Sequence, residues 1–206
     1  MKIFCVGRNY VEHAKELGNA IPDEPVIFMK PKSALLQTNV PFYYPEFTNE
    51  LHYEAELVFQ ICKNGKYIKQ KDAPHFYNKI TVGIDFTARD IQNELKKKGL
   101  PWEKAKAWDQ SAVVGKWLPI EKDMMKKPIE FSLFKNNEQV QLGNTTQMIY
   151  TVDYLIAHIS NYFSLNIGDL IFTGTPEGVG PIVPGDSLTA RIAGIRELNL
   201  TIGPAP

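Results

Sequence analysis

The sequence predicts a strand-rich α+β fold with a few short helices. Prolines and glycines, 14 of each, are spread along the 206 residues and divide the chain into many short apolar segments. Several segments alternate apolar and polar residues, which is typical of strands with one buried face. Strands and helices do not alternate regularly, and this disfavours a doubly wound parallel sheet. The composition, 44% hydrophobic and 22% charged, is that of a globular protein, and the length predicts one domain over residues 1–206.

The first predicted helix lies near the start of the chain. It runs from Tyr10 to Leu17, with Asn9 as its N-cap and Gly18 directly after its end. Asparagine is a favoured N-cap because its side chain can accept a hydrogen bond from a free backbone N–H of the first turn. Glycine is favoured after the last turn because it adopts the left-handed conformation there without strain.

Two more helices are predicted further along. Thr87 and Asp90 have the spacing of a capping box, and the helix that they begin should end at Gly99. Thr151 can cap the third helix. The third helix carries an apolar face at helical spacing, made of Val152, Leu155, Ile156, Ile159 and Phe163.

The clearest strand covers residues 54–61. Its side chains divide into two faces: Ala55, Leu57, Phe59 and Ile61 on one, and Glu54, Glu56, Val58 and Gln60 on the other. We expect the first face to lie in the core, which leaves the glutamate face free for solvent or for a site. Further strands are predicted at 129–133, before an Asn136-Asn137 hairpin turn, and at 170–173, 188–192 and 198–202.

Charge and cysteine content exclude several classes of function. The chain has 23 basic residues (lysine and arginine) and 23 acidic residues (aspartate and glutamate), so its net charge is zero. A zero net charge argues against nucleic acid as the main partner and permits self-association. Cys5 and Cys62 are too few for a disulfide framework or a cysteine zinc site. The sequence has no signal-peptide pattern and no apolar run long enough to cross a membrane. We therefore expect a soluble cytoplasmic protein.

Three carboxylates form the first candidate site. Glu54 and Glu56 share one face of a strand, and Asp85 ends another short apolar strand just before Thr87. Together they favour a hard divalent ion such as Mg²⁺, Mn²⁺ or Ca²⁺ over zinc. The alternative is an ordinary solvated strand face. His52 could add a fourth ligand, although we rather expect it to contact one of the ligand residues or to lie on the surface.

Other polar pairs lie at helical spacing. Arg89 and Gln92 share a helix face suited to a substrate carboxylate, unless they are an ordinary exposed pair. His13 and Glu16 could form a general-base dyad or a surface ion pair. Lys106 lies among small and aromatic residues that could hold its ammonium group in a cleft. The loop 173–180 lacks a phosphate-loop ending, but its small residues allow close approach of backbone N–H groups to a ligand.

Taken together, these segments resemble the fumarylacetoacetate hydrolase superfamily over nearly the whole chain. The matching motifs are Gly7-Arg8-Asn9-Tyr10 with His13 and Glu16, Leu51 to Glu56, Asp85 to Asp90 with Gln92, Lys97 to Trp102 with Ala105-Lys106, and Thr173 to Pro181. The Lys-Gly-Leu-Pro-Trp stretch is most similar to the branch of acylpyruvate hydrolases and oxaloacetate decarboxylases. Trp108-Asp109-Gln110 departs from the usual Phe-Asp-Thr, which affects the expected acyl-group preference.

The resemblance implies a mixed β-sandwich roll, a homodimer, and Mg²⁺ or Mn²⁺ on Glu54, Glu56 and Asp85. It further implies that a lid carries His13 and Glu16, and that the substrate is clamped by Arg89, Gln92, Lys106 and Thr175. The activity implied is cleavage of a 2,4-dioxo acid or decarboxylation of oxaloacetate. The alternatives are an isomerase or decarboxylase of the 2-hydroxyhepta-2,4-diene-1,7-dioate type and a non-catalytic, metal-stabilised scaffold.

Overall fold

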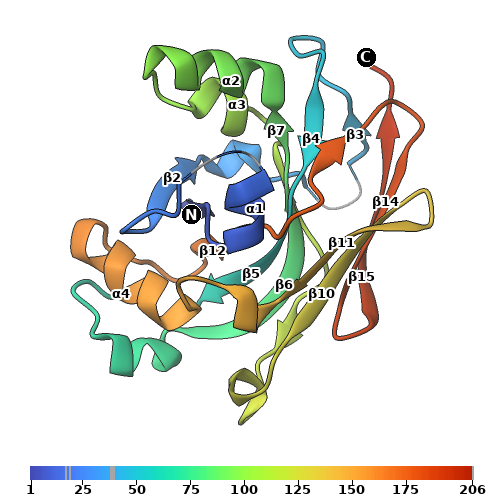
Figure 1. The fold of residues 1–206 in the computed structure, drawn as a ribbon. Helices are drawn as coiled ribbons and strands as arrows, with labels where there is room; N and C mark the ends of the chain where they lie inside the picture. The colour runs from blue at the N-terminus through green and yellow to red at the C-terminus, as the bar shows by residue number, and fades with distance from the viewer. Residues whose placement is uncertain (17, 19, 38–39, 206) are drawn as a thin grey trace.

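The computed structural model describes residues 1–16, 18, 20–37 and 40–205, whose strands form two larger sheets and one small sheet (Figure 1). In the first sheet the order is β2 (Val26–Lys30), β1 (Ile3–Gly7), β12 (Leu170–Phe172), β5 (Ala55–Ile61), β6 (Tyr77–Asp85) and β8 (Ala112–Val114), and β9 (Leu118–Pro119) also pairs with β6. β1 and β12 run parallel, whereas β5 is antiparallel to both of its neighbours, so this sheet is mixed.

The second sheet is built mainly from hairpins. Its order is β11 (Glu138–Asn144), β10 (Glu130–Lys135), β14 (Ser187–Ile192), β15 (Ile195–Gly203) and β3 (Phe42–Tyr43). The small sheet contains β13 (Gly180–Pro181), β4 (Leu51–Tyr53) and β7 (Thr87–Ala88). Asn136 and Asn137 connect β10 to β11 with φ of 51° and 69°, as a two-residue type I′ turn requires, so the predicted hairpin is confirmed.

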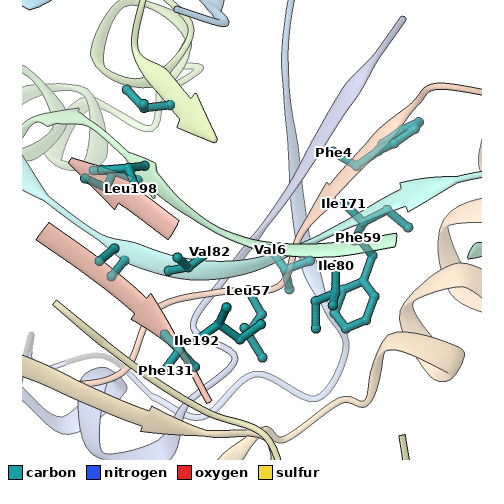
Figure 2. Packing of buried hydrophobic residues seen from close by; sticks show 14 of the residues in the cluster. Phe4, Val6, Leu57, Phe59, Ile80, Val82, Phe131, Ile171, Ile192 and Leu198 are labelled. Atoms are coloured by element: carbon teal, nitrogen blue, oxygen red, sulfur yellow. The ribbon is translucent and has the colours of Figure 1, made fainter. Parts of the chain in front are cut away.

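The core lies where the two larger sheets face each other. Leu57 and Phe59 of β5 pair with Val82 and Ile80 of β6, and all four belong to one buried cluster. Figure 2 shows this cluster continuing to Phe131, Ile192 and Leu198 of the second sheet. This packing is that of a β-sandwich with a few helices, so the predicted fold class is confirmed.

Four α-helices and four 3₁₀ turns connect the described strands. The helices are α1 (Val11–Glu16), α2 (Arg89–Lys98), α3 (Glu103–Lys106) and α4 (Val152–Tyr162). The 3₁₀ turns are Lys32–Ala34, Gln70–His75, Met124–Lys126 and Thr145–Gln147. In the described part of the chain, no helix is both long enough and apolar enough to cross a membrane.

Two predicted helix ends are confirmed. Gly99 ends α2 in the left-handed conformation, with φ of 63°, and its N–H bonds to carbonyl groups of the last turn. The Thr151 hydroxyl accepts a hydrogen bond from the Tyr154 N–H at the start of α4, and four of the five expected apolar positions, Val152, Leu155, Ile156 and Ile159, are buried. Phe163 is the C-cap residue, just beyond α4, and is partly buried. Leu17, the predicted last residue of the first helix, lies outside the described residues.

Two predicted caps are wrong because tertiary contacts use the same side chains. The Asn9 amide donates to the carbonyls of Tyr150 and Thr173 and accepts from the Tyr150 N–H, so it joins distant segments instead of capping α1. Thr87 belongs to β7, and its hydroxyl donates to Glu54. Ala88 is the N-cap residue of α2 and makes no side-chain cap.

For the glutamate face of the strand at 54–61, solvent exposure is one of the two alternatives that the sequence leaves open, and the structure excludes it. Val58, on that face, is fully buried in a second apolar cluster with Cys5 and Phe172. Glu54 and Glu56 are themselves buried. Both faces of β5 are therefore covered, because Leu57 and Phe59 pack in the first cluster and Val58 packs in the second. The two glutamates are shielded from solvent.

Candidate metal centre and active site

The centre of the site consists of three buried carboxylates. Glu54 lies between β4 and β5, Glu56 is the second residue of β5, and Asp85 is the last residue of β6. The backbone holds these elements together, because Asp85 N–H donates to the Glu54 carbonyl at 2.8 Å and Glu56 pairs with Gly83. Each side chain offers an oxygen within 4.8 Å of the others, and their exposed fractions are 6%, 2% and 0%. The predicted carboxylate group is therefore assembled.

Three cationic side chains surround the carboxylates. The Lys106 ammonium donates to Glu54 Oε2 at 2.7 Å and to Asp85 Oδ2 at 2.9 Å. Arg89 Nη2 donates to Glu54 Oε1 at 2.7 Å, and Lys30 Nζ lies 2.7 Å from Asp85 Oδ1. Each of the three cations is buried. The three cations balance the formal charge of the three carboxylates, which could not otherwise be desolvated together.

The charges set the protonation of Glu54 and Lys106. Burial acts to raise the pKa of Glu54, but Lys106 and Arg89 outweigh it and hold that pKa well below its usual range. Burial likewise acts to lower the pKa of Lys106, and Asp85 and Glu54 reverse the effect and raise it. Both groups are therefore charged at neutral pH, as an ion pair.

The pKa of Glu56 is shifted in the opposite direction from that of Glu54. Burial, followed by the negative charges of Asp85 and Glu54, raises its pKa well above the usual range. Its Oε2 accepts a hydrogen bond from Gly174 N–H at 2.7 Å. Gly174 has φ of 96°, and a Cβ there would lie 2.8 Å from the Asn9 Cβ, so the glycine permits both the turn and the close approach.

The donor set fits a hard divalent cation. Three carboxylates in a group without cysteine or histidine are typical ligands of Mg²⁺, Mn²⁺ or Ca²⁺. Asp85 Oδ1 is buried and, among the described residues, accepts no aligned hydrogen bond although Lys30 lies beside it. The pKa of Glu56 is raised first by burial and then by the charges of Asp85 and Glu54, so this carboxylate too lacks a compensating positive charge. A divalent ion would satisfy both groups.

His13 and Glu16 form the predicted pair on α1. His13 Nδ1 lies 3.1 Å from Glu16 Oε2, and Glu16 Oε1 accepts a hydrogen bond from Gly178 N–H at 3.0 Å. His13 is buried, whereas Glu16 remains partly exposed. Burial lowers the pKa of His13, although Glu54 and Glu16 oppose this, so the imidazole is neutral at neutral pH. A neutral, oriented imidazole is able to accept a proton.

The remaining predicted residues enclose the same cleft. Its walls include the three carboxylates, His13, Arg89, Gln92, Lys106 and Thr175. Arg89 Nη1 donates to Gln92 Oε1 at 2.6 Å, which fixes the pair on the cleft side of α2. The cleft encloses only about 30 Å³, and a neighbouring cavity of about 400 Å³ shares Phe28, Trp102 and Lys106 with it. The cavity therefore adjoins the cleft at Lys106.

His52 is not part of the carboxylate group. Its Nε2 lies 3.0 Å from Glu50 Oε1, and its Nδ1 accepts a hydrogen bond from Arg89 Nε at 3.4 Å. It therefore contacts Arg89 and Glu50 and no carboxylate of the group. This agrees with the sequence analysis, which favoured a place outside the ligand set over the role of a fourth ligand.

Two buried polar residues of the site were not predicted. Lys30, on β2, donates to both the carbonyl and the hydroxyl of Ser111 at 3.0 Å and also to the Lys106 carbonyl. Gln141, on β11, accepts from Ala55 N–H at 2.9 Å and donates to the Thr175 hydroxyl at 2.8 Å. A lysine ending an apolar strand and a glutamine in a hairpin carry no distinctive local pattern, so only the tertiary fold reveals them.

Comparison with known proteins identifies the family. Residues 2–203 match the family described as fumarylacetoacetate (FAA) hydrolase C-terminal. The chain belongs to this family. The resemblance that the sequence motifs indicated is thereby confirmed.

Curated relatives act on oxaloacetate, according to their names. The family member described here is 42% identical to a mitochondrial oxaloacetate tautomerase of Arabidopsis thaliana over 203 residues, which cover 98% of this chain and 90% of the relative. It is also 42% identical to a mitochondrial oxaloacetate decarboxylase of Dictyostelium discoideum over 195 residues, covering 94% and 89% of the two chains.

Solved structures of the family share the fold. The fumarylpyruvate hydrolase of Pseudomonas aeruginosa, in complex with Mn²⁺ and pyruvate, superposes with a TM-score of 0.92 at 36% identity and covers 98% of this chain and 89% of its own. The 5-carboxymethyl-2-hydroxymuconate delta-isomerase of Mycobacterium smegmatis gives a TM-score of 0.85 at 34% identity, covering 100% and 79%. The Mn²⁺ of the first and the carboxylate group of this family member together support a divalent metal site.

The metal site can be tested by replacing one ligand without disturbing the fold. Because the raised pKa of Glu56 favours its neutral form without metal, Glu56→Gln should keep the melting temperature of the metal-free protein. Mn²⁺ at about 100 times its Kd should raise the melting temperature of the wild type by about 5–10 °C. It should leave that of Glu56→Gln nearly unchanged. The matched control Glu50→Gln, at an exposed position outside the group, should respond as the wild type does. An equal rise in Glu56→Gln would remove Glu56 from the ligand set.

Proposed function

We propose that this protein is a metal-dependent enzyme that acts on 2-oxo acids with a carbonyl or carboxylate at position 4. The reactions proposed are hydrolytic C–C cleavage of acylpyruvates and decarboxylation of oxaloacetate. One observation carries the proposal: three buried carboxylates converge beside Lys106, which contacts two of them, and beside the His13–Glu16 pair. The names of the relatives support the same substrate class.

Mg²⁺ is the metal that we propose for Glu54, Glu56 and Asp85, with Mn²⁺ and Ca²⁺ as alternatives for the same oxygen ligands. When bound, the divalent ion would act as a Lewis acid toward the 2-oxo acid end of the substrate and favour its enolate. Arg89, Gln92 and Thr175 line the cleft beside these carboxylates and offer guanidinium, amide and hydroxyl groups to the substrate's carboxylate.

Lys106 and His13 take separate roles in the proposed cleavage. Since Glu16 faces His13 Nδ1, the Nε2 atom is left to accept a proton from water. The water oxygen then bonds to C4, and the C3–C4 bond breaks with its electron pair moving to C3. The enolate that results takes the proton from His13 at C3, which gives pyruvate and a carboxylic acid. The buried, charged Lys106 stabilises the negative charge that develops. Decarboxylation of oxaloacetate breaks the same bond without water and releases CO₂.

Isomerisation is the second candidate function. The solved delta-isomerase shares this fold, and the Arabidopsis tautomerase aligns with 98% of this chain at 42% identity. Isomerisation and tautomerisation both move a proton within the substrate. The same metal site and the same base would serve that chemistry. A non-catalytic scaffold is disfavoured, because a scaffold needs neither a buried His13–Glu16 pair nor a buried Lys106 in contact with the carboxylates.

The proposal separates hydrolysis from decarboxylation. His13→Ala should lower kcat/KM for acetylpyruvate by about 10²–10⁴, the usual range for a lost acid–base catalyst. Its effect on oxaloacetate decarboxylation should be much smaller, because that reaction uses no water nucleophile. Lys106→Met should damage both reactions, and removal of the metal by EDTA should abolish them.

Release of pyruvate from each substrate, measured with one preparation and one metal, gives the comparison. Equal losses in both reactions for His13→Ala would contradict a role in activating water and leave α1 a structural role only. If the wild type with Mg²⁺ releases pyruvate from neither substrate but isomerises a 2-oxo acid, the second candidate function replaces the first.

We also propose a two-fold homodimer, as the family resemblance and the zero net charge indicate. Sedimentation velocity at micromolar concentration should give about twice the 23.4 kDa mass of the chain. A sedimentation coefficient of the monomer at that concentration would contradict this.

The names of the Arabidopsis and Dictyostelium relatives place those proteins in mitochondria, and the cytoplasmic location of this chain stays a prediction from its sequence.

A further inference from the structure

A buried glutamine of the second sheet reaches the wall of the cleft from outside it. Gln141 lies on β11 and is only 2% exposed. Its Oε1 accepts a hydrogen bond from Ala55 N–H at 2.9 Å, and Ala55 separates the two glutamates of the metal centre in the chain. Its Nε2 donates to the Thr175 hydroxyl at 2.8 Å and to the Pro176 carbonyl at 3.0 Å. The proposed chemistry gives this residue no role.

The neighbours of Gln141 fix the orientation of its amide. A backbone N–H can only donate a hydrogen bond, and a backbone carbonyl can only accept one. The amide oxygen must therefore face Ala55, and the amide nitrogen must face Pro176 and Thr175. The Thr175 hydroxyl oxygen is thus the acceptor toward Gln141. The hydroxyl proton has to point in another direction.

The proton of the Thr175 hydroxyl is available to a ligand. Thr175 is 3% exposed and lines the cleft. Among the described residues, its hydroxyl takes part in one hydrogen bond, as the acceptor from Gln141. The Thr87 hydroxyl, by contrast, already donates to Glu54 at 3.0 Å. A buried donor without an acceptor is unfavourable, so an anion bound in the cleft would stabilise this arrangement.

The loop that carries Thr175 lies directly against β11. Gly178 has φ of 90°, and a Cβ there would collide with the Val140 carbonyl oxygen, so glycine permits both the turn and the contact. A Cβ at Gly143 would lie 3.0 Å from Pro176 Cγ, which shows a second close approach of the loop to this strand. Gln141 lies between these two contacts. The second sheet therefore holds the loop at a fixed distance from the amide of Gln141.

We propose that Gln141 is a positioning residue that turns the Thr175 hydroxyl proton into the cleft, toward the carboxylate of the bound 2-oxo acid. The inference rests on the proposed function, in which Thr175 offers its hydroxyl group to that carboxylate. Gln141 is absent from the described residues that line the cleft, so it acts through Thr175 and not on the substrate itself. Without the amide, the hydroxyl is free to rotate, and every rotation that turns the proton away from the cleft weakens binding.

The role of Gln141 concerns binding more than the chemical step. The carboxylate of a 2-oxo acid keeps its charge throughout cleavage, so the Thr175 hydroxyl binds the substrate and the transition state about equally. Loss of such an interaction raises KM and leaves kcat nearly unchanged. A variant that only damaged the fold would lower the amount of active enzyme, and hence the apparent kcat, without raising KM.

The test measures the affinity of the Mg²⁺-loaded protein for pyruvate, a 2-oxo acid that has no carbonyl group at position 4 to be cleaved. Calorimetric titration gives this affinity without turnover. Thr175→Val removes the hydroxyl and keeps the shape of the side chain, whereas Thr175→Ser keeps the hydroxyl. Gln141→Met removes the amide at similar length. Gln139→Met is the matched control, because Gln139 is exposed on the same strand.

We expect Thr175→Val to bind pyruvate about 10–100 times more weakly than the wild type, the range for a hydrogen bond to a charged group. Gln141→Met should lose most of the same affinity. The double variant should bind about as weakly as Thr175→Val alone, because the two residues act as one unit. Thr175→Ser and Gln139→Met should bind as the wild type does. With acetylpyruvate, Gln141→Met should raise KM at nearly constant kcat.

Several results would overturn the inference and leave the proposed function intact. They are unchanged pyruvate affinity in Thr175→Val or in Gln141→Met, losses that multiply in the double variant, and an equal loss in Gln139→Met. If Gln141→Met does not fold, Gln141→Asn replaces it, since a side chain shorter by one methylene cannot reach both Ala55 and Thr175. Failure of the Mg²⁺-loaded wild type to bind pyruvate would instead contradict the proposed function, and the role of Gln141 would fall with it.

Discussion

The site depends on the repulsion among three carboxylates that the fold removes from water. Glu54, Glu56 and Asp85 can be buried together only because cations contact two of them and the third takes up a proton or shares a metal ion. Lys106 bridges two carboxylates and so carries much of this compensation. In the proposed function, the same lysine is held, charged, where it would stabilise a developing enolate. The interaction that permits burial of the carboxylates would then also position a group for catalysis.

The architecture supplies this arrangement from elements that are far apart in the sequence. β5 and β6 carry two of the carboxylates, and α3 carries Lys106. Lys30, on the edge strand β2, links Asp85 to Ser111 and to the Lys106 carbonyl. The second sheet contributes Gln141, which joins β5 to the loop that holds Thr175. Both sheets of the sandwich therefore contribute to the surroundings of the cleft, and the core packed between them (Figure 2) holds these elements in place.

The sequence predicted what depends on local pattern. Alternation located β5, two asparagines located the β10–β11 turn, and carboxylate spacing on one strand brought Glu54 and Glu56 together. It failed where a side chain makes a tertiary contact instead of a local one, as Asn9 and Thr87 do. It also could not show that the glutamate face of β5 is buried, because alternation identifies two faces but not what covers each. Lys30 had no signal at all, since its partner Ser111 is distant in sequence.

The most direct test of this account is a crystal structure with Mn²⁺, using anomalous scattering at the manganese edge. We expect one anomalous peak enclosed by Glu54, Glu56 and Asp85, with Lys106 retained beside the site. Saturating Mn²⁺ that gives no peak there, with Lys106 still bridging Glu54 and Asp85 as in the metal-free arrangement, would contradict it. The cluster would then be a buried ion-pair network whose role is structural.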